Sequence, residues 1–64
     1  MYKKYETLKN KFGVTDAEIS RETGISQSTL SDWKMGRYEP KVDKLLKIAK
    51  FFNVSLDYFM EESA

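Results

Sequence analysis

Cysteine and histidine are both absent from this chain of 64 residues. Without cysteine there is no disulfide and no thiol chemistry, and without either residue type a zinc site of the usual Cys/His kind is excluded. The lack of histidine also removes the commonest general base. No nucleophile stands beside a base, and so small a core leaves no room for a large pocket. We therefore expect no catalytic residue, no metal site and no cofactor.

Long apolar runs and a strong excess of charge are missing as well. No stretch approaches the roughly 18 apolar residues of a membrane span, and no signal-peptide pattern is visible, so we expect a cytoplasmic protein. The formal net charge is only +1, which is low for a protein that binds nucleic acid. The charges are unevenly distributed, because Met1–Lys11 is rich in lysine and Leu56–Ala64 is acidic.

Chain length and even composition predict a single domain over residues 1–64. A chain of this size buries only about 60% of the surface that it exposes when unfolded, so we expect a small core and low stability. No internal repeat, low-complexity segment or second domain is visible. Glu61–Ala64 is expected to be a tail or the start of a linker.

Helical periodicity is the main signal that the sequence does contain. Apolar residues recur three and four positions apart, and no strand pattern competes with them. We expect five short helices, over Tyr2–Phe12, Asp16–Thr23, Gln27–Met35, Lys41–Phe52 and Leu56–Met60. The apolar stripes of the first and fourth helices are Tyr5, Leu8 and Phe12, and Leu45, Ile48, Ala49 and Phe52. The lysines between these residues are expected to form solvated faces.

The stretch Asp16–Gly36 has the local signals of two short helices joined by a tight turn. Thr15 is a suitable N-cap, and Glu18 follows three residues later, as in a capping box. Gly24 comes after the first of these helices, where a chain often needs a positive φ that glycine adopts without a Cβ clash. Ser26 can cap the second helix by accepting a hydrogen bond from an early backbone N–H.

The second of these helices has an unusual outer face. Leu30 and Trp33 lie three residues apart, so both are expected in the core, and Trp33 is interpreted as a core residue rather than a stacking surface. The residues left outside are mostly short and uncharged, namely Gln27, Ser28, Ser31 and Asp32. Glutamine can form two hydrogen bonds with adenine, and serine can bond to several bases. This face suits contact with DNA bases, and a plain polar face is the alternative interpretation.

This pattern resembles a known family. The residues that stand at the spacing of the helix-turn-helix of lambda-repressor and Cro-like proteins are Ile19, Ser20, Gly24, Ile25, Ser26, Leu30 and Gly36. The stretch Pro40–Met60 resembles the fourth and fifth helices of the family, and the resemblance covers Leu8–Met60. It implies an all-α fold, a compact bundle of five short helices. It also implies sequence-specific binding to double-stranded DNA by a bacterial or phage repressor, with the third helix in the major groove.

The resemblance also implies individual contacts. The positions that would read bases are Gln27, Ser28 and Asp32. The positions that would contact phosphate are Ser26, Thr29, Lys34, Arg37, Tyr38 and Lys41. Three alternatives stay open. Phosphates would repel Asp32. Ser26 can serve only as a helix cap and Thr29 only as a packing residue, and the loop Lys34–Lys41 can be merely solvated. The family commonly has a phosphate-binding glutamine where this chain has Asp16, so we expect that aspartate to cap its helix instead.

Two hypotheses concern the partner. In the first, a weak homodimer forms through the C-terminal helix and binds a pseudo-palindromic operator, with Phe51, Tyr58 and Met60 as surplus apolar surface; a monomer that covers them is the alternative. In the second, the fold is a protein-interaction module of antitoxin or adaptor type, which the low net charge and the surplus aromatics favour. Gln27 and Ser28 argue against it, because hot spots of protein interfaces are usually Trp, Tyr or Arg.

Overall fold

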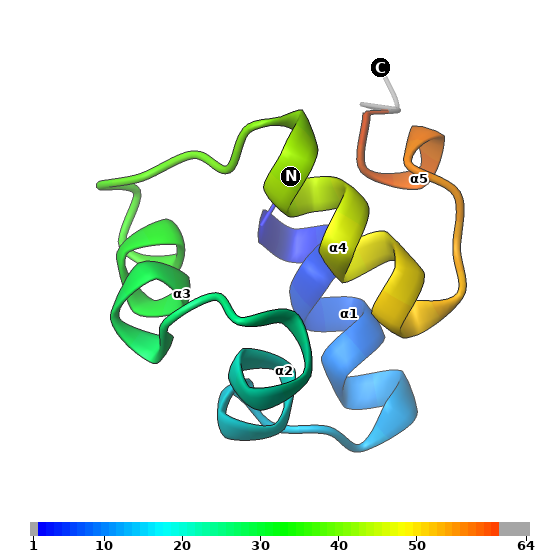
Figure 1. Cartoon of the computed structure of the whole chain (residues 1–64), viewed down its shortest axis with the longest axis horizontal. Coiled ribbons are helices and arrows are strands. Elements are labelled where there is room, and N and C mark those ends of the chain that lie inside the picture. The colour runs from blue at the N-terminus through cyan, green and yellow to red at the C-terminus, as the bar shows by residue number, and fades with distance from the viewer. Residues whose placement is uncertain (1, 61–64) are drawn as a thin grey trace.

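The computed structural model describes residues 2–60, and within this part of the chain all regular structure is helical. The helices are α1 (Tyr2–Phe12), α2 (Asp16–Thr23), α3 (Gln27–Lys34), α4 (Val42–Phe52) and α5 (Asp57–Met60), as Figure 1 shows. The prediction of five short helices is confirmed. Three ends differ by one residue: α3 ends before Met35, α4 begins after Lys41 and α5 begins after Leu56. The predicted tail, Glu61–Ala64, lies outside the described residues.

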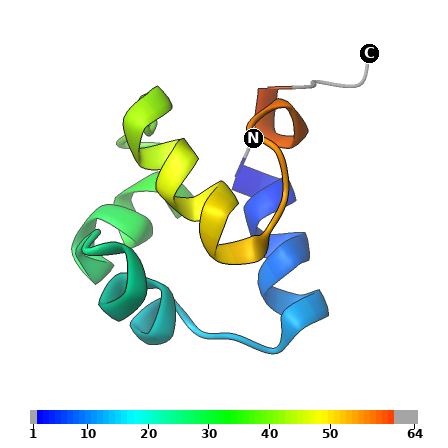
Figure 2. The same cartoon turned by 45° about the vertical axis from the view of Figure 1, so that its right-hand side comes forward.

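The core is formed by one buried cluster to which every helix contributes. Its members are Tyr5, Leu8, Ile19, Ile25, Leu30, Trp33, Leu45, Ile48, Ala49, Phe52 and Phe59. The largest share comes from α4, whose whole predicted stripe is buried. Figures 1 and 2 show α4 in the middle of the molecule, with α2 and α3 to one side of it and α5 towards the other.

Aromatic rings join three helices within this core. The ring of Tyr5 in α1 lies 4.9 Å from that of Trp33 in α3 and 6.3 Å from that of Phe52 in α4, measured between centroids. Tyr2 meets the edge of Trp33 at 5.3 Å. Such tilted and edge-to-face pairs are favourable beyond the area that they bury. Trp33 is 5% exposed, so its placement in the core is confirmed.

The apolar surface differs from the prediction at several positions. Phe12, the last residue of α1, is 51% exposed, although its ring meets that of Phe52 edge-on at 5.4 Å. Phe51 and Tyr58 pack partly against the core, whereas Met60 is exposed as predicted. The other large apolar side chains that are exposed in the described part of the chain are Met35, Val42 and Leu46.

The last helix is attached to the first. Phe59 of α5 is fully buried, and Lys4 Nζ of α1 donates a hydrogen bond of 2.8 Å to the Tyr58 carbonyl while lying 5.3 Å from the centroid of the Tyr58 ring. A helix of four residues does not persist in isolation. The contacts with α1 therefore hold α5 in place.

The turn between α2 and α3 has the backbone conformation that the sequence predicts. Gly24 has φ +78°, and its N–H donates to the Ser20 carbonyl at 2.9 Å. A Cβ placed on Gly24 would meet no other atom within 4 Å. Any cost of a side chain there must come from the left-handed backbone conformation and not from a collision.

Substitutions at Gly24 should separate these two effects. Gly24→Val should lower the free energy of unfolding by more than about 1 kcal/mol, because a β-branched residue is strained at positive φ. Gly24→Asn should cost clearly less, because asparagine tolerates this conformation. Chemical denaturation followed by circular dichroism measures both values. Equal stability of the valine variant and the parent protein would contradict this placement of the turn.

Candidate nucleic-acid interface

The threonine before Gly24 fixes the path of the chain from α2 into α3. Thr23 Oγ1 donates a hydrogen bond of 2.7 Å to the Ile19 carbonyl and accepts one of 3.2 Å from the Ile25 N–H. Ile25 is then buried in the core. This role of Thr23 was not predicted from the sequence. A threonine at a helix end can bond back to the preceding turn, which is a recognisable signal for such a role.

Both predicted caps are present. Thr15 Oγ1 accepts a hydrogen bond from the Glu18 N–H at 3.2 Å, and Ser26 Oγ accepts one from the Thr29 N–H at 3.1 Å. Ser26 Oγ and Thr29 Oγ1 also lie 2.8 Å apart. One hydroxyl hydrogen bridges these two oxygens, so the other hydroxyl hydrogen can still be donated to a ligand.

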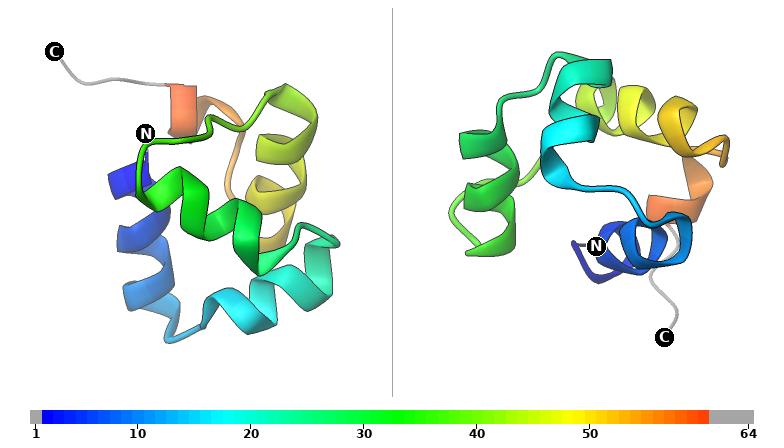
Figure 3. Two further views of the ribbon diagram at one scale, coloured as in Figure 1. Left: turned by 90° about the vertical axis from the view of Figure 1, so that its left-hand side faces the viewer. Right: turned by 90° about the horizontal axis from the view of Figure 1, so that it is seen from below.

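The outer side of α3 carries the polar residues that the sequence places there. Leu30 and Trp33 are buried on the inner side, whereas Gln27, Ser28 and Ser31 are exposed. In the left view of Figure 3, α3 lies in front of the rest of the molecule, so this outer side faces open space. Because the core holds the inner side of α3, the backbone that carries its outer side chains has a defined position.

The loop after α3 brings a cation back toward that helix. Gly36 has φ +78°, and the Arg37 N–H donates to the Asp32 carbonyl at 2.8 Å. The Arg37 guanidinium then lies 3.7 Å from the Asp32 carboxylate, with both side chains largely exposed. An ion pair this exposed adds little stability, but it places Asp32 and Arg37 side by side at the same end of α3.

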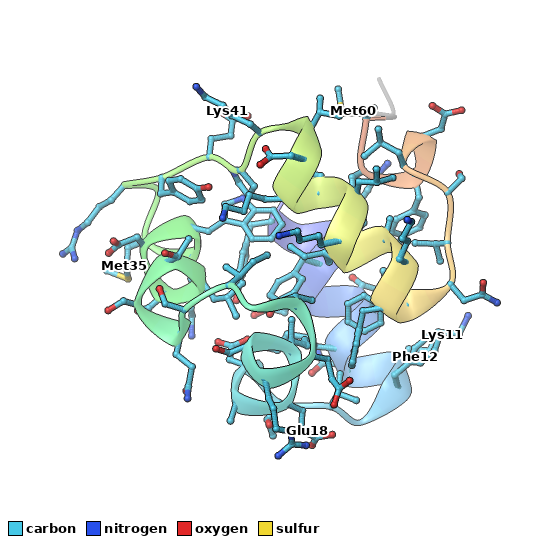
Figure 4. The ribbon with its side chains drawn as sticks, in the orientation of Figure 1. Lys11, Phe12, Glu18, Met35, Lys41 and Met60 are labelled. Atoms are coloured by element: carbon cyan, nitrogen blue, oxygen red, sulfur yellow. The ribbon has the colours of Figure 1, made fainter. Side chains whose placement is uncertain are left out.

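The remaining predicted phosphate contacts lie at the end of α3 and in the segment that leads to α4. Lys34, at the end of α3, and Lys41, just before α4, are exposed. Figure 4 shows Met35 and Lys41 on either side of the loop that joins α3 to α4. Tyr38 is half-buried and lines a shallow pocket with Tyr2 and Trp33.

Asp16, the first residue of α2, is bound by side chains of α1. Its Oδ1 accepts a hydrogen bond of 2.7 Å from the Tyr5 hydroxyl and lies 2.7 Å from Lys9 Nζ. The Lys9 side chain is only 18% exposed and lies over the Tyr5 ring, 5.2 Å from its centroid. The expectation that Lys9 belongs to a solvated face is therefore wrong. The Asp16 carboxylate links α2 to α1, which the predicted capping role did not include.

The same contacts shift the proton affinities of these groups. Partial burial by itself would raise the pKa of Asp16, but the hydrogen bonds from Lys9 and Tyr5 outweigh burial and lower the pKa below its ordinary value. Burial, followed by the hydrogen bond to the Asp16 carboxylate, raises the pKa of Tyr5. At neutral pH the network therefore contains an ionised Asp16 and a protonated Tyr5.

Residues 2–60 support neither a metal site nor a membrane-spanning helix. This part of the chain holds no group of three or more acidic, histidine or cysteine side chains arranged for a metal ion. None of its helices is long and apolar enough to cross a membrane.

Comparisons with known proteins agree with this geometry. A family model described as helix-turn-helix matches residues 5–59. The HTH-type transcriptional regulator ImmR of Bacillus subtilis is 31% identical over 58 residues, which are 91% of this chain and 46% of ImmR. An uncharacterised HTH-type transcriptional regulator of Methanocaldococcus jannaschii is 34% identical over 61 residues, which are 94% of this chain and 88% of that protein. No solved structure matches the chain.

These matches identify the class of protein. The chain belongs to the family of lambda-repressor and Cro-like helix-turn-helix proteins, as its sequence predicts. It carries the DNA-binding domain of this family, with α2 and α3 as the helix-turn-helix. The chain spans about half the length of ImmR and most of the length of the archaeal relative.

Replacing Asp16 should reduce stability at neutral pH and make stability less sensitive to acid. A carboxylate whose pKa is lowered by folding stabilises the fold above its unfolded pKa, and this contribution is lost as the pH falls through the folded pKa. Asp16→Asn should therefore cost about 1 kcal/mol at neutral pH. Its difference from the parent should shrink below about pH 4. Thermal melting across this pH range measures the effect.

The control for this experiment is Asp57→Asn, which removes an exposed carboxylate from the start of α5. The control should keep the acid dependence of the parent protein. If the asparagine variants at positions 16 and 57 lose stability in parallel at every pH, the network with Tyr5 and Lys9 does not have the role assigned to it.

Proposed function

We propose that this chain recognises a specific sequence in double-stranded DNA by placing α3 in the major groove, and that it acts as a transcriptional repressor of bacterial or phage type. The observation that carries the proposal is the row of short, exposed polar side chains on a helix whose other side is fixed in the core. Binding, without catalysis, accounts for the function. A DNA partner agrees with the predicted cytoplasmic location.

Base recognition is assigned to the residues on the outer side of α3. Gln27 and Ser28 lie in its first turn, the part of a recognition helix that enters the major groove. Gln27 is suited to adenine, since its amide offers a donor and an acceptor together. Asp32 can accept from the amino group of cytosine, but it lies 3.7 Å from the Arg37 guanidinium. Arg37 would partly offset the repulsion between Asp32 and nearby phosphates.

Phosphate contacts are assigned to both ends of α3. At its N-terminus, the hydroxyl pair of Ser26 and Thr29 has one hydrogen left to donate. At its other end, the exposed cations are Lys34, Arg37 and Lys41. Tyr38 of the same loop is half-buried and adds a hydroxyl. Such contacts fix the register of the protein on DNA, while base contacts select the sequence.

Repression would follow from occupancy of the operator, because a bound protein obstructs polymerase. A single small domain offers few base contacts, so high affinity requires two copies on half-sites about one helical turn apart. If each copy neutralises about three phosphates, the logarithm of the affinity of a dimer should fall against the logarithm of salt concentration with a slope of about −5.

An exposed apolar surface on α4 and α5 supports a second copy of this chain as the partner. Val42 and Leu46 lie one turn apart on α4 and are 54% and 42% exposed, and Met60 of α5 is 51% exposed. Val42 and Met60 line one groove together with Lys41 and Asp43, and Figure 4 shows Lys41 and Met60 at one edge of the molecule. Charges of both signs beside an apolar surface suit an isologous two-fold contact between two copies.

Selection from a randomised pool of duplexes at low salt tests the function directly. Enrichment of an inverted repeat would support a dimer that reads sequence, and enrichment of a single half-site would support reading by a monomer. A folded protein that enriches no sequence would contradict the proposal and favour the protein-interaction hypothesis.

The substitution Gln27→Ala should change the preferred base at one position of the selected site. We expect a loss of about 1–3 kcal/mol in discrimination at that base pair, and unchanged stability, because Gln27 is exposed. Asn10→Ala, which removes an exposed amide from α1, is the matched control and should leave discrimination unchanged. Binding titrations with single-base variants of the site measure both. Equal base preferences in the Gln27 variant and the parent would remove Gln27 from the contact.

The substitution Val42→Glu should weaken binding to an inverted repeat and leave binding to a single half-site unchanged. An unpaired carboxylate would be buried if Val42 packs against a second copy, which is costly. Asn10→Glu adds the same charge to an exposed position of α1 and serves as control. Sedimentation and titration with both duplexes give the result. If the two variants behave alike on the inverted repeat, the dimer forms elsewhere or not at all.

A further inference from the structure

The start of α2 carries a negative charge that is held by contacts with α1. Asp16 accepts the Tyr5 hydroxyl and pairs with Lys9, both at 2.7 Å. Its side chain is still 30% exposed, whereas that of Lys9 is only 18% exposed. The positive charge of Lys9 is thus directed at Asp16 and is largely covered from solvent.

The helix that begins with this carboxylate lies beside α3. α2 packs against α3, and the left view of Figure 3 shows α2 running below it. Lys34 of α3 is near enough to Asp16 to act on its carboxylate electrostatically.

A docked helix-turn-helix brings the DNA backbone to this place. The second helix enters the major groove while the first crosses the backbone. The start of a helix ordinarily attracts a phosphate, because its free N–H groups and its dipole favour an anion. In this chain the first residue of α2 is Asp16, whose carboxylate repels phosphate and pairs with Lys9 of α1.

We propose that Asp16 weakens sequence-independent binding to the DNA backbone, so that affinity depends more strongly on the base contacts of α3. The inference rests on the DNA-binding function proposed above. Phosphate contacts supply almost all non-specific affinity, and a lost contact at α2 lowers that affinity for every sequence alike. Base contacts at Gln27 and Ser28 are unaffected by the loss, so the ratio of specific to non-specific affinity rises.

The test compares the removal of two carboxylates. Asp16→Asn and Asp57→Asn change the net charge equally, and each replaces the first residue of a helix, but Asp57 lies on α5. Asp16→Ser is a second neutral variant, with a shorter side chain. Affinities for the selected duplex and for a duplex of scrambled sequence are measured between about 50 and 200 mM salt. The temperature is kept low enough for circular dichroism to verify the fold of each variant.

We expect both Asp16 variants to bind the scrambled duplex about three- to tenfold more tightly than the parent, with a salt slope steeper by about one. The ratio of specific to non-specific affinity should fall. Asp57→Asn should change either affinity less than about twofold.

A merely structural role of Asp16 would reduce stability without tightening binding. If the parent binds DNA and the Asp16 variants bind no more tightly than the Asp57 variant, this inference is overturned and the proposed function stands. If the parent binds neither duplex, the proposed function fails, and the inference fails with it.

Discussion

The orientation of α3 depends on the burial of Leu30 and Trp33. A helix of eight residues has little stability by itself in water, and most of its order comes from packing one side against the rest of the protein. Here the Trp33 ring lies 4.9 Å from Tyr5, which in turn lies 6.3 Å from Phe52. α1, through Tyr5, and α2, which packs against α3, thus form the surface on which α3 rests. The outer side chains of α3 have defined positions because its inner side has one place to pack.

Tyr5 couples this packing to the electrostatics of the neighbouring helix. Its ring faces Trp33 of α3, and its hydroxyl donates to Asp16 of α2. One side chain of α1 therefore contacts both helices of the helix-turn-helix. Since Lys9 stands one turn further along α1 and pairs with the same carboxylate, α1 positions α2 through a charge and α3 through an aromatic surface. The angle between α2 and α3 follows from both contacts and from the turn at Gly24.

Local signals predicted most of the fold, because they depend on neighbours in the sequence. The caps at Thr15 and Ser26 and the positive φ at Gly24 are set within a few residues, and all three are confirmed. The partners of Asp16 and the burial of most of the Lys9 side chain are set by the way in which α1 meets α2, which no local pattern contains. The groove beside Val42 arises in the same way from two separate helices. Base and phosphate contacts stay predictions, since a sequence pattern identifies a face and not the molecule that meets it.

Trp33 is the single tryptophan of the chain. It stands on the buried side of α3 and beside the half-buried Tyr38 of the following loop, which lines the same pocket. Every other large aromatic side chain is a tyrosine or a phenylalanine, so excitation of the indole addresses one location only. The intrinsic fluorescence of this protein therefore reports on the packing of α3 against the core. No attached dye is needed to follow how that helix responds to a ligand or to heat.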